Sequence, residues 1–386
     1  MLLARSPGAA TLRAPALAIC AAAFLALGAC GRQGGGPLLL GLAVPLTDTE
    51  GAEDTYGVRS RLGAELAVEE INKAGGIGRR QLALRVVNDK GDPESAIAAA
   101  DSLVNDPRVL AVVGHVYSGA TIKAAATYQG RVAALATSAT SPEVSRLGPW
   151  IYRVASSDSA NAVALAQMAR QMGRRIGVLY ANDDYGQGLA RNFMAALEKG
   201  GVAAVAADPF LDDTGDFTPY LRRMQRRGVD LVFLAGLQDP AARAITQAQS
   251  LGMQARFMGG DGIEGLAAAG ARFDGTGVGL LFHPQMSDSS RAFAARYRAR
   301  YGDEPDSQAA LAYDAVRLMA RALADGRQTP EAIRGYLEHV GQDGGPPAFE
   351  GVAGRVAFDS NGDPVNKQFT LGVIQGGRIV LPTEAR

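Results

Sequence analysis

The sequence predicts an α/β protein with two lobes, each built on a doubly wound parallel sheet. Short apolar runs alternate with stretches whose apolar residues recur at helical spacing, which is typical of parallel strands joined by covering helices. The alternation starts near Leu38, is interrupted by a polar break around Ala155 to Asp158, and starts again at Ile176. The chain has 386 residues, of which 47% are hydrophobic, and this is enough for two domains with buried cores.

The first half opens with a run from Leu38 to Val44 that is short and ends at Pro45, as expected of a buried strand. From Leu62 to Ala74 the apolar residues have helical spacing, and the stretch ends at Gly75-Gly76, a typical C-terminal cap. The other expected elements are strands at 82–87, 109–113 and 132–135 and helices at 93–104 and about 119–128.

The second half repeats this pattern. We expect strands at 176–180, 202–206, 231–234 and 257–258, and helices at 188–199, 217–227 and 240–251. A strand at 278–282 is followed by helices near 289–301, 307–325 and 330–341, and short strands at 356–358 and 369–373 close the chain. Besides the polar break, a second candidate crossing between the lobes lies near 283–288.

The N-terminus has the residue order of a secretory signal, with Arg5 and Arg13, the apolar stretch Ala14 to Leu27, and then small residues. A membrane-spanning helix needs about 20 apolar residues, so this stretch is too short to be one. The segment Leu27-Gly28-Ala29-Cys30 resembles the bacterial lipobox, in which cleavage precedes a Cys that receives lipid. We expect a signal peptide at 1–29 and, at 30–37, the lipidated Cys30 with a flexible tether. The alternative is a soluble exported protein cleaved near Ala29.

Composition argues against several classes of function. Cys20 lies in the signal and Cys30 would carry lipid, so residues 31–386 have no thiol for a disulfide, a zinc cluster or a nucleophile. Lys plus Arg equals Asp plus Glu at 39 each, and no basic run is present, so nucleic acid is not an expected partner.

Catalytic motifs are also missing. The histidines are His115, His283 and His339, and a Ser118/His115 pair lacks the Gly-x-Ser-x-Gly context of a nucleophile elbow. No glycine-rich phosphate-binding or dinucleotide-binding motif occurs. We expect no enzyme activity, no cofactor and no metal site.

Two loops are candidate ligand-binding segments because they follow the carboxyl ends of expected strands. Residues 114–121 follow the strand that ends at Val113, and residues 137–143 follow the strand that ends at Leu135. Both loops offer hydroxyl and N–H groups without a cation, which suits a small carboxylate better than a phosphate. The alternative is that these Ser and Thr residues only cap helices.

Several motifs occur in a characteristic order and spacing from about Leu38 to the C-terminus, namely the segments 74–77, 92–93, 114–115, 138–143, 183–188 and 257–262. Together they resemble the leucine/isoleucine/valine-binding family of ABC importers. The resemblance implies a type I periplasmic-binding fold, in which the chain crosses between lobes three times and the ligand lies in the cleft. It implies a first lobe at 38–157 plus 284–355 and a second lobe at 158–283 plus 356–386.

The resemblance also assigns candidate ligand-binding residues. Ser118 matches the loop Ser that bonds the ligand carboxylate, and Asp261 matches the acid that pairs with the ammonium. Ser138, Ala139 and Thr140 match the second loop, whose backbone and hydroxyl groups hold both ends of the ligand. A buried zwitterion needs such partners, because an unpaired buried charge is costly. Without the family, Asp261 would be interpreted as a turn residue in Gly-Asp-Gly.

Further positions match aromatic residues of the family or depart from it. Tyr56 matches an aromatic residue on the first lobe, and Tyr185 matches one on the second. Leu237 stands where the family usually has a ligand-contacting aromatic residue, so it opens space. Asp261 replaces the more frequent Glu, and Ser307-Gln308 lies where the family can place an apolar wall.

The expected function is that of a solute-binding lipoprotein of an ABC importer, holding a small amino acid of branched-chain or aliphatic type, or an analogue. Its partners would be that ligand, the permease subunits, and the membrane through the lipid anchor. We expect an exported monomer, periplasmic or at the cell surface. The alternatives are a binder of amides, urea, aromatic acids or keto acids on the same fold, or a ligand sensor.

Overall fold

A computed structural model describes residues 36–367 and 369–382 of the chain. The expected signal peptide at 1–29, the expected lipidated Cys30 and the tether up to residue 35 lie outside the described residues. From Pro37 onward the chain forms one compact unit, which contains two large sheets.

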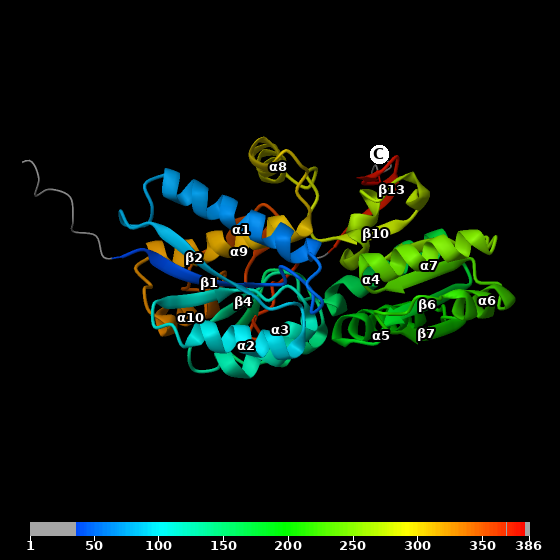
Figure 1. Ribbon diagram of the computed structural model, residues 1–386, viewed down its shortest axis with the longest axis horizontal. Coiled ribbons are helices and arrows are strands. Elements are labelled where there is room, and N and C mark those ends of the chain that lie inside the picture. The colour runs from blue at the N-terminus through cyan, green and yellow to red at the C-terminus, as the bar shows by residue number, and fades with distance from the viewer. Residues whose placement is uncertain (1–35, 368, 383–386) are drawn as a thin grey trace, which may run out of the picture. The chain divides into compact units, whose positions relative to one another are not determined.

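The first sheet is five-stranded and entirely parallel, with the strand order β2-β1-β3-β4-β5. Its strands are β1 (Leu38–Val44), β2 (Leu82–Asn88), β3 (Val109–Val113), β4 (Ala134–Ala136) and β5 (Ile151–Arg153). Helices cover both faces (Figure 1): α1 (Thr55–Lys73) and α9 (Ser307–Ala324) lie on one, and α2 (Pro93–Val104) and α3 (Ser118–Tyr128) on the other.

Alternation along β1 explains why both faces are covered. Leu40 and Leu42 belong to the core under α1 and α9, whereas Ala43 points to the core under α2 and α3. Helices α1 and α9 pack closely, since a Cβ on Gly63 would lie 2.0 Å from the carbonyl oxygen of Ala309. Glycine is therefore required at this helix contact.

The second sheet is seven-stranded, with the order β14-β13-β10-β9-β8-β6-β7. Its parallel strands are β6 (Ile176–Ala181), β7 (Ala206–Phe210), β8 (Leu231–Ala235), β9 (Arg256–Gly259) and β10 (Gly277–Leu280). The strands β13 (Thr370–Gln375) and β14 (Arg378–Val380) pair antiparallel at one edge. Four helices cover this sheet: α4 (Asp158–Met172), α5 (Asp184–Lys199), α6 (Thr218–Arg226) and α7 (Gln238–Ser250).

The α/β prediction with two sheet-based lobes is confirmed, but some elements differ from expectation. Helix α1 begins at Thr55 rather than near 62, and α5 begins at Asp184, capped by Asp183, rather than at 188. Helix α4 was not predicted at all. Its seven buried residues include two polar residues and three alanines, among them Ala162 and Ala166, and this mixture gives a weak apolar signal just after the polar break.

The strand expected at 202–206 was wrong, since β7 spans Ala206–Phe210. This segment contains Pro209, which ordinarily argues against a strand. The structure places β7 at the edge of the sheet, where a residue without an N–H is tolerated.

The chain passes between the sheets three times, after β5, after β10 and before β13. Between the second and third passages lie α8 (Asp288–Tyr301), α9, α10 (Pro330–Glu338) and the hairpin of β11 (Phe349–Gly351) and β12 (Gly354–Val356). Among the helices of residues 36–367 and 369–382, none combines the length and apolar character needed to cross a membrane.

The third passage lies later than the sequence-based boundary at 355/356. The N–H of Phe358 donates to Val340 O at 3.0 Å, and Gly362 O accepts from the N–H of Arg153 at 3.1 Å. Residues 358–362 therefore contact the first lobe. These contacts favour a boundary near Lys367.

Candidate functional site

A cavity of about 510 Å³ is lined by segments of both lobes. Most of these segments follow the carboxyl ends of parallel strands, where loop amides and helix N-termini are exposed. The first lobe contributes Asp48, Asp54, Tyr56, Lys90, Gly91, Pro93, Val116, Tyr117, Ser118, Gly119, Ser138 and Gln308. The second lobe contributes Asn182, Asp183, Asp184, Tyr185, Gln187, Asp212, Leu237, Asp261 and Gly262.

The structure places most of the expected ligand-binding residues along this one cavity. The residues that line it are Tyr56, Ser118, Ser138, Tyr185, Leu237 and Asp261. Ala139 and Thr140 are fully buried and are not among the lining residues. The side chains of these two residues therefore do not form the cavity surface.

Ser118 is the first residue of α3 and joins the two candidate loops. Its hydroxyl accepts a hydrogen bond from the N–H of Ser141 at 3.1 Å, and the residue is only 3% exposed. Ser118 and Gly119 form the part of the cavity wall at the start of this 11-residue helix. The first N–H groups of a helix have no intrahelical acceptor, so this wall favours an anionic group.

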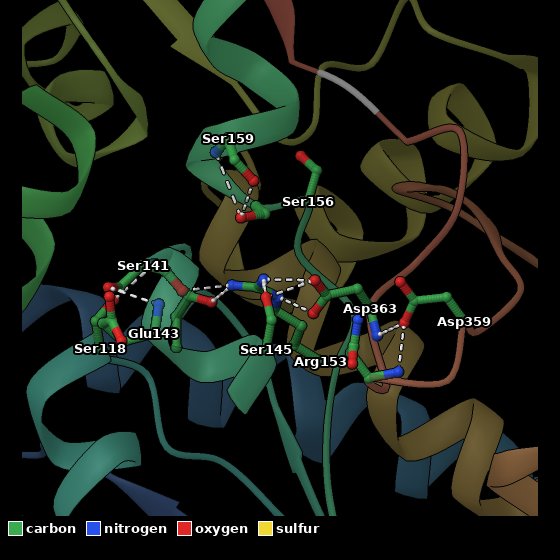
Figure 2. Close-up of polar contacts among 12 residues, drawn as sticks. Ser118, Ser141, Glu143, Ser145, Arg153, Ser156, Ser159, Asp359 and Asp363 are labelled. Carbon is green, nitrogen blue, oxygen red and sulfur yellow. Dashed lines mark hydrogen bonds and ion pairs between the residues drawn. The ribbon is translucent and has the colours of Figure 1, made fainter. Parts of the chain in front are cut away.

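The second loop is held from its buried side by Arg153, the last residue of β5 (Figure 2). The guanidinium is fully buried and donates to the carbonyl oxygens of Ala139 at 3.1 Å and Ser141 at 2.8 Å. It also forms an ion pair with Asp363, with an Nε–Oδ1 distance of 2.7 Å. The same side chain thus ties the loop to the segment before the third passage.

Asp261 follows β9 and lies opposite these loops. It is 4% exposed, and Tyr185 donates its hydroxyl proton to the Asp261 Oδ1 at 3.0 Å. The Tyr185 oxygen accepts from the N–H of Gly262 at 3.0 Å, so the pair is rigidly placed. Burial raises the pKa of Asp261 to about 6, and no Lys or Arg among the described residues pairs with it.

Asp158, the first residue of α4, is a second buried carboxylate that the sequence analysis did not single out. It is completely buried, and neither oxygen has a hydrogen-bond partner of normal geometry among the described residues. Burial raises its pKa well above the ordinary value and the negative charge of Asp261 adds to this, whereas the nearby Thr140 hydroxyl and the positive charge of Arg153 oppose it. The N–H of Asp158 donates to Thr140 O at 2.9 Å. The second loop thus lies beside a buried carboxyl group that forms no ion pair and whose charge Arg153 offsets only in part.

Its place in the sequence could have identified Asp158 as a candidate residue of the site. It follows Ser157 at the expected lobe crossing, and an acidic residue in the first turn of a helix is common. That pattern alone does not distinguish a capping residue from a buried charge.

Tyr56 was expected only as an aromatic residue at the ligand, but its hydroxyl also forms hydrogen bonds with the other lobe. Its hydroxyl donates to Gly262 O at 2.7 Å and accepts from the N–H of Gln238 at 3.0 Å. Both partners lie on the second lobe. The hydroxyl therefore bridges the lobes, and the ring, packed edge-on against Tyr117 at 5.8 Å, remains as the surface facing the cavity.

His115 lies just behind the first loop and is fully engaged in the core. Its Nδ1 lies 2.5 Å from Asp89 Oδ2, and its Nε2 lies 2.9 Å from the hydroxyl of Tyr128. With both ring nitrogens in these contacts, His115 is not placed to act as a base for Ser118. Within the described part of the chain, no group of His, Cys, Asp and Glu side chains is arranged to hold a metal ion.

Residues 40–378 match the protein family described as "Periplasmic binding protein". The chain is 30% identical to a leucine-, isoleucine-, valine-, threonine- and alanine-binding protein of Pseudomonas aeruginosa, over 86% of this chain and 88% of that protein. It is also 28% identical to a Leu/Ile/Val-binding protein homolog of Brucella suis, over 89% of this chain and 91% of that protein.

Solved structures agree with this relationship. An ABC transporter substrate-binding protein of Desulfitobacterium hafniense in complex with Leu is 29% identical, with a TM-score of 0.76 over 90% of this chain and all of that one. A branched-chain amino acid transporter substrate-binding protein of Streptococcus pneumoniae in complex with isoleucine is 26% identical, with a TM-score of 0.79 over 90% of this chain and all of that one. A type 1 periplasmic binding protein of Bordetella pertussis, 22% identical with a TM-score of 0.77 over 90% of this chain and 99% of that one, shows the same fold. The expected type I periplasmic-binding fold is thus confirmed, and the chain belongs to the leucine/isoleucine/valine-binding family of periplasmic binding proteins.

Proposed function

We propose that this protein is the exported solute-binding component of an ABC importer and that it holds an α-amino acid, or a close analogue, in the cavity between its lobes. The single observation that carries this proposal is the placement of Asp261. A buried carboxylate without a cationic partner lies across the cavity from a helix N-terminus lined by Ser118. A zwitterion with one ammonium and one carboxylate complements both sides.

The carboxylate end of the ligand is assigned to the first lobe. The start of α3 supplies N–H groups, and Ser118 and Ser138 supply hydroxyl groups at the cavity surface. Charge-assisted hydrogen bonds of this kind contribute about 1.5–3 kcal/mol each. Since neither Lys nor Arg belongs to these two loops, a monoanionic carboxylate fits them better than a phosphate.

The ammonium end is assigned to Asp261, with Asp158 as a second source of negative potential. Two buried carboxyl groups whose charges repel each other, and of which only Asp158 has a cation nearby in Arg153, are difficult to ionise in the empty protein. An ammonium placed near both would relieve this cost. Binding energy would then come in part from removing an electrostatic defect of the empty site.

Names of the relatives favour an aliphatic side chain on the ligand, as the sequence motifs also did. Amides, urea, aromatic acids and keto acids remain the alternative ligands, and sensing through another partner remains the alternative role. We propose binding rather than catalysis, because the groups at the cavity supply charge and hydrogen bonds but no nucleophile paired with a base. We also propose that the protein is exported and that a lipid on Cys30 anchors it to the membrane.

The proposal is tested by a thermal-shift screen of the purified protein, stripped of ligand. The panel contains amino acids together with their desamino and decarboxylated counterparts, amides and urea. A ligand that binds only the folded protein raises the melting temperature by mass action. At a ligand concentration of one hundred times Kd, the free energy of unfolding rises by about 2.7 kcal/mol. We expect shifts only with ligands that carry both the ammonium and the carboxylate. A response to the desamino acids alone would refute the amino-acid assignment.

A further inference from the structure

We propose that the Tyr56 hydroxyl of the first lobe positions the ammonium-binding carboxylate Asp261 of the second lobe when the cleft closes. This inference rests on the proposed amino-acid function and adds a positioning residue to the same site. Tyr56 acts on Asp261 through the backbone of Gly262 and the hydroxyl of Tyr185. The second lobe alone then holds an incomplete ammonium site, and closure of the lobes completes it.

A series of hydrogen bonds connects Tyr56 to Asp261. The Tyr56 hydroxyl donates to Gly262 O at 2.7 Å. The N–H of the same glycine donates to the Tyr185 oxygen at 3.0 Å, and the Tyr185 hydroxyl donates to Asp261 Oδ1 at 3.0 Å. Burial raises the pKa of both tyrosines far above the ordinary value, so both hydroxyls keep the proton that they donate.

The backbone around Asp261 needs such external support because glycine stands on both sides of it, as Gly260 and Gly262. Glycine has the largest conformational freedom of all residues, so hydrogen bonds from outside the loop are needed to fix its orientation. A Cβ on Gly262 would lie 2.7 Å from Gly236 O and 2.9 Å from the Tyr185 hydroxyl oxygen, so no larger residue fits there. Since Tyr185 contacts Gly262 this closely, a displaced Gly262 backbone would also disturb the hydrogen bond from Tyr185 to Asp261.

The Tyr56 hydroxyl fixes a second loop of the same lobe. Its oxygen accepts from the N–H of Gln238 at 3.0 Å, at the start of α7. The preceding residue, Leu237, lines the cavity together with Asp261. Both hydrogen bonds of the hydroxyl therefore end on the second lobe, one on the loop after β8 and one on the loop after β9. Tyr56 itself belongs to α1 of the first lobe, so these bonds exist only while the lobes are in contact.

A simpler role for Tyr56 would be that of a latch, which holds the lobes together without affecting Asp261. Loss of a latch weakens every ligand that closes the cleft to the same extent. Loss of a positioning residue weakens a ligand with an ammonium more, because a charge-assisted hydrogen bond depends on the placement of its acceptor. The two roles therefore differ in how the loss depends on the ligand.

Tyr56→Phe separates these roles, because it keeps the ring and removes only the hydroxyl. Leucine and its desamino counterpart isocaproate are titrated into the full chain, freed of ligand, and into the variant by calorimetry, with the weaker ligand measured by competition. If leucine gives no thermal shift, the amino acid with the largest shift and its desamino counterpart replace them. We expect leucine to lose about tenfold in affinity and isocaproate about threefold or less.

A double-mutant cycle with Tyr185→Phe tests the connection through Tyr185. This variant already releases Asp261, so adding Tyr56→Phe should then cost leucine only about threefold, rather than about tenfold. Tyr301→Phe is the matched control, because the Tyr301 hydroxyl donates to Leu62 O at 3.0 Å within the first lobe and the residue does not line the cavity. It should leave both affinities unchanged within about twofold.

The outcomes separate this inference from the proposed function. Equal losses for leucine and isocaproate in Tyr56→Phe, or no loss for either, would overturn the inference. An undiminished loss in the Tyr185→Phe background would also overturn it, as would the same losses in Tyr301→Phe. In each of these cases the amino-acid function would stand. Failure of every α-amino acid to bind the wild type would refute the proposed function itself.

Discussion

Replacing Asp261 with Asn should weaken ligand binding while making the empty protein more stable. Asn keeps the size of the side chain and can still accept the hydrogen bond of Tyr185, but it removes the anion. Truncating one member of a desolvated charged pair costs about 2–5 kcal/mol, which is a loss of tens to thousands of fold in affinity. An amino acid should therefore lose most of its affinity.

The gain in stability follows from the pKa. In the folded protein the pKa of Asp261 is raised from 3.8 to about 6 by burial, so ionisation is harder there than in the unfolded chain. The cost is absent below pH 3.8, grows as pH rises toward 6, and is constant above that. At about 1.4 kcal/mol for each pKa unit, it reaches about 3 kcal/mol at pH 7. The Asn variant should match the wild type in acid and exceed it at neutral pH.

Calorimetry supplies the discriminating comparison. The best amino acid and its desamino acid are titrated into the wild type and into Asp261→Asn. Only the amino acid should lose affinity, because only it carries the ammonium. If both ligands lose affinity equally, Asp261 is a structural turn residue. If the wild type prefers the desamino acid from the start, the ligand is a carboxylate without the ammonium.

Four further predictions concern other parts of the molecule. Asp158→Asn should reduce amino-acid affinity about tenfold, because the ligand ammonium favours the ionised form of Asp158 and Asn cannot ionise, and an unchanged calorimetric Kd would contradict that role. Arg153→Met should lower the free energy of unfolding by about 3–5 kcal/mol, because it removes the partner of Asp363, and denaturant titration measures this. In a bacterium, the full chain should be labelled by fatty acid and partition with membranes, whereas Cys30→Ala should do neither; equal labelling would end the lipoprotein proposal. Saturating ligand should reduce the radius of gyration in solution scattering, and an unchanged profile would argue against hinge closure.

Periodicity along the chain was sufficient to predict the fold. Alternating apolar runs and helical stretches depend only on near neighbours, so most strands of both sheets could be placed from them. The elements that were missed depend on distant partners. Helix α4 has a buried face of mixed polar and small residues that becomes significant only when packed, and β7 tolerates Pro209 only because the sheet ends there.

The candidate site was predictable to the extent that it lies at strand ends. Ser118 and Asp261 both come just after a strand, and the cavity lies where such segments of the two sheets meet. Order and spacing of motifs were enough to select these positions. The sequence by itself thus determined the family and the α/β fold, and most of the ligand-binding residues that it assigned line the cavity.

Only the tertiary structure decided which polar groups are buried and what each one contacts. Asp158 is a buried carboxyl group without an ion pair because α4 and the second loop meet there. The Tyr56 hydroxyl forms its hydrogen bonds with Gly262 and Gln238 on the other lobe. Thr140 likewise proved to be packed away from the cavity surface. The cost of a charge or a free hydroxyl depends on the dielectric and the partners around it, and these are supplied by residues far away in the chain.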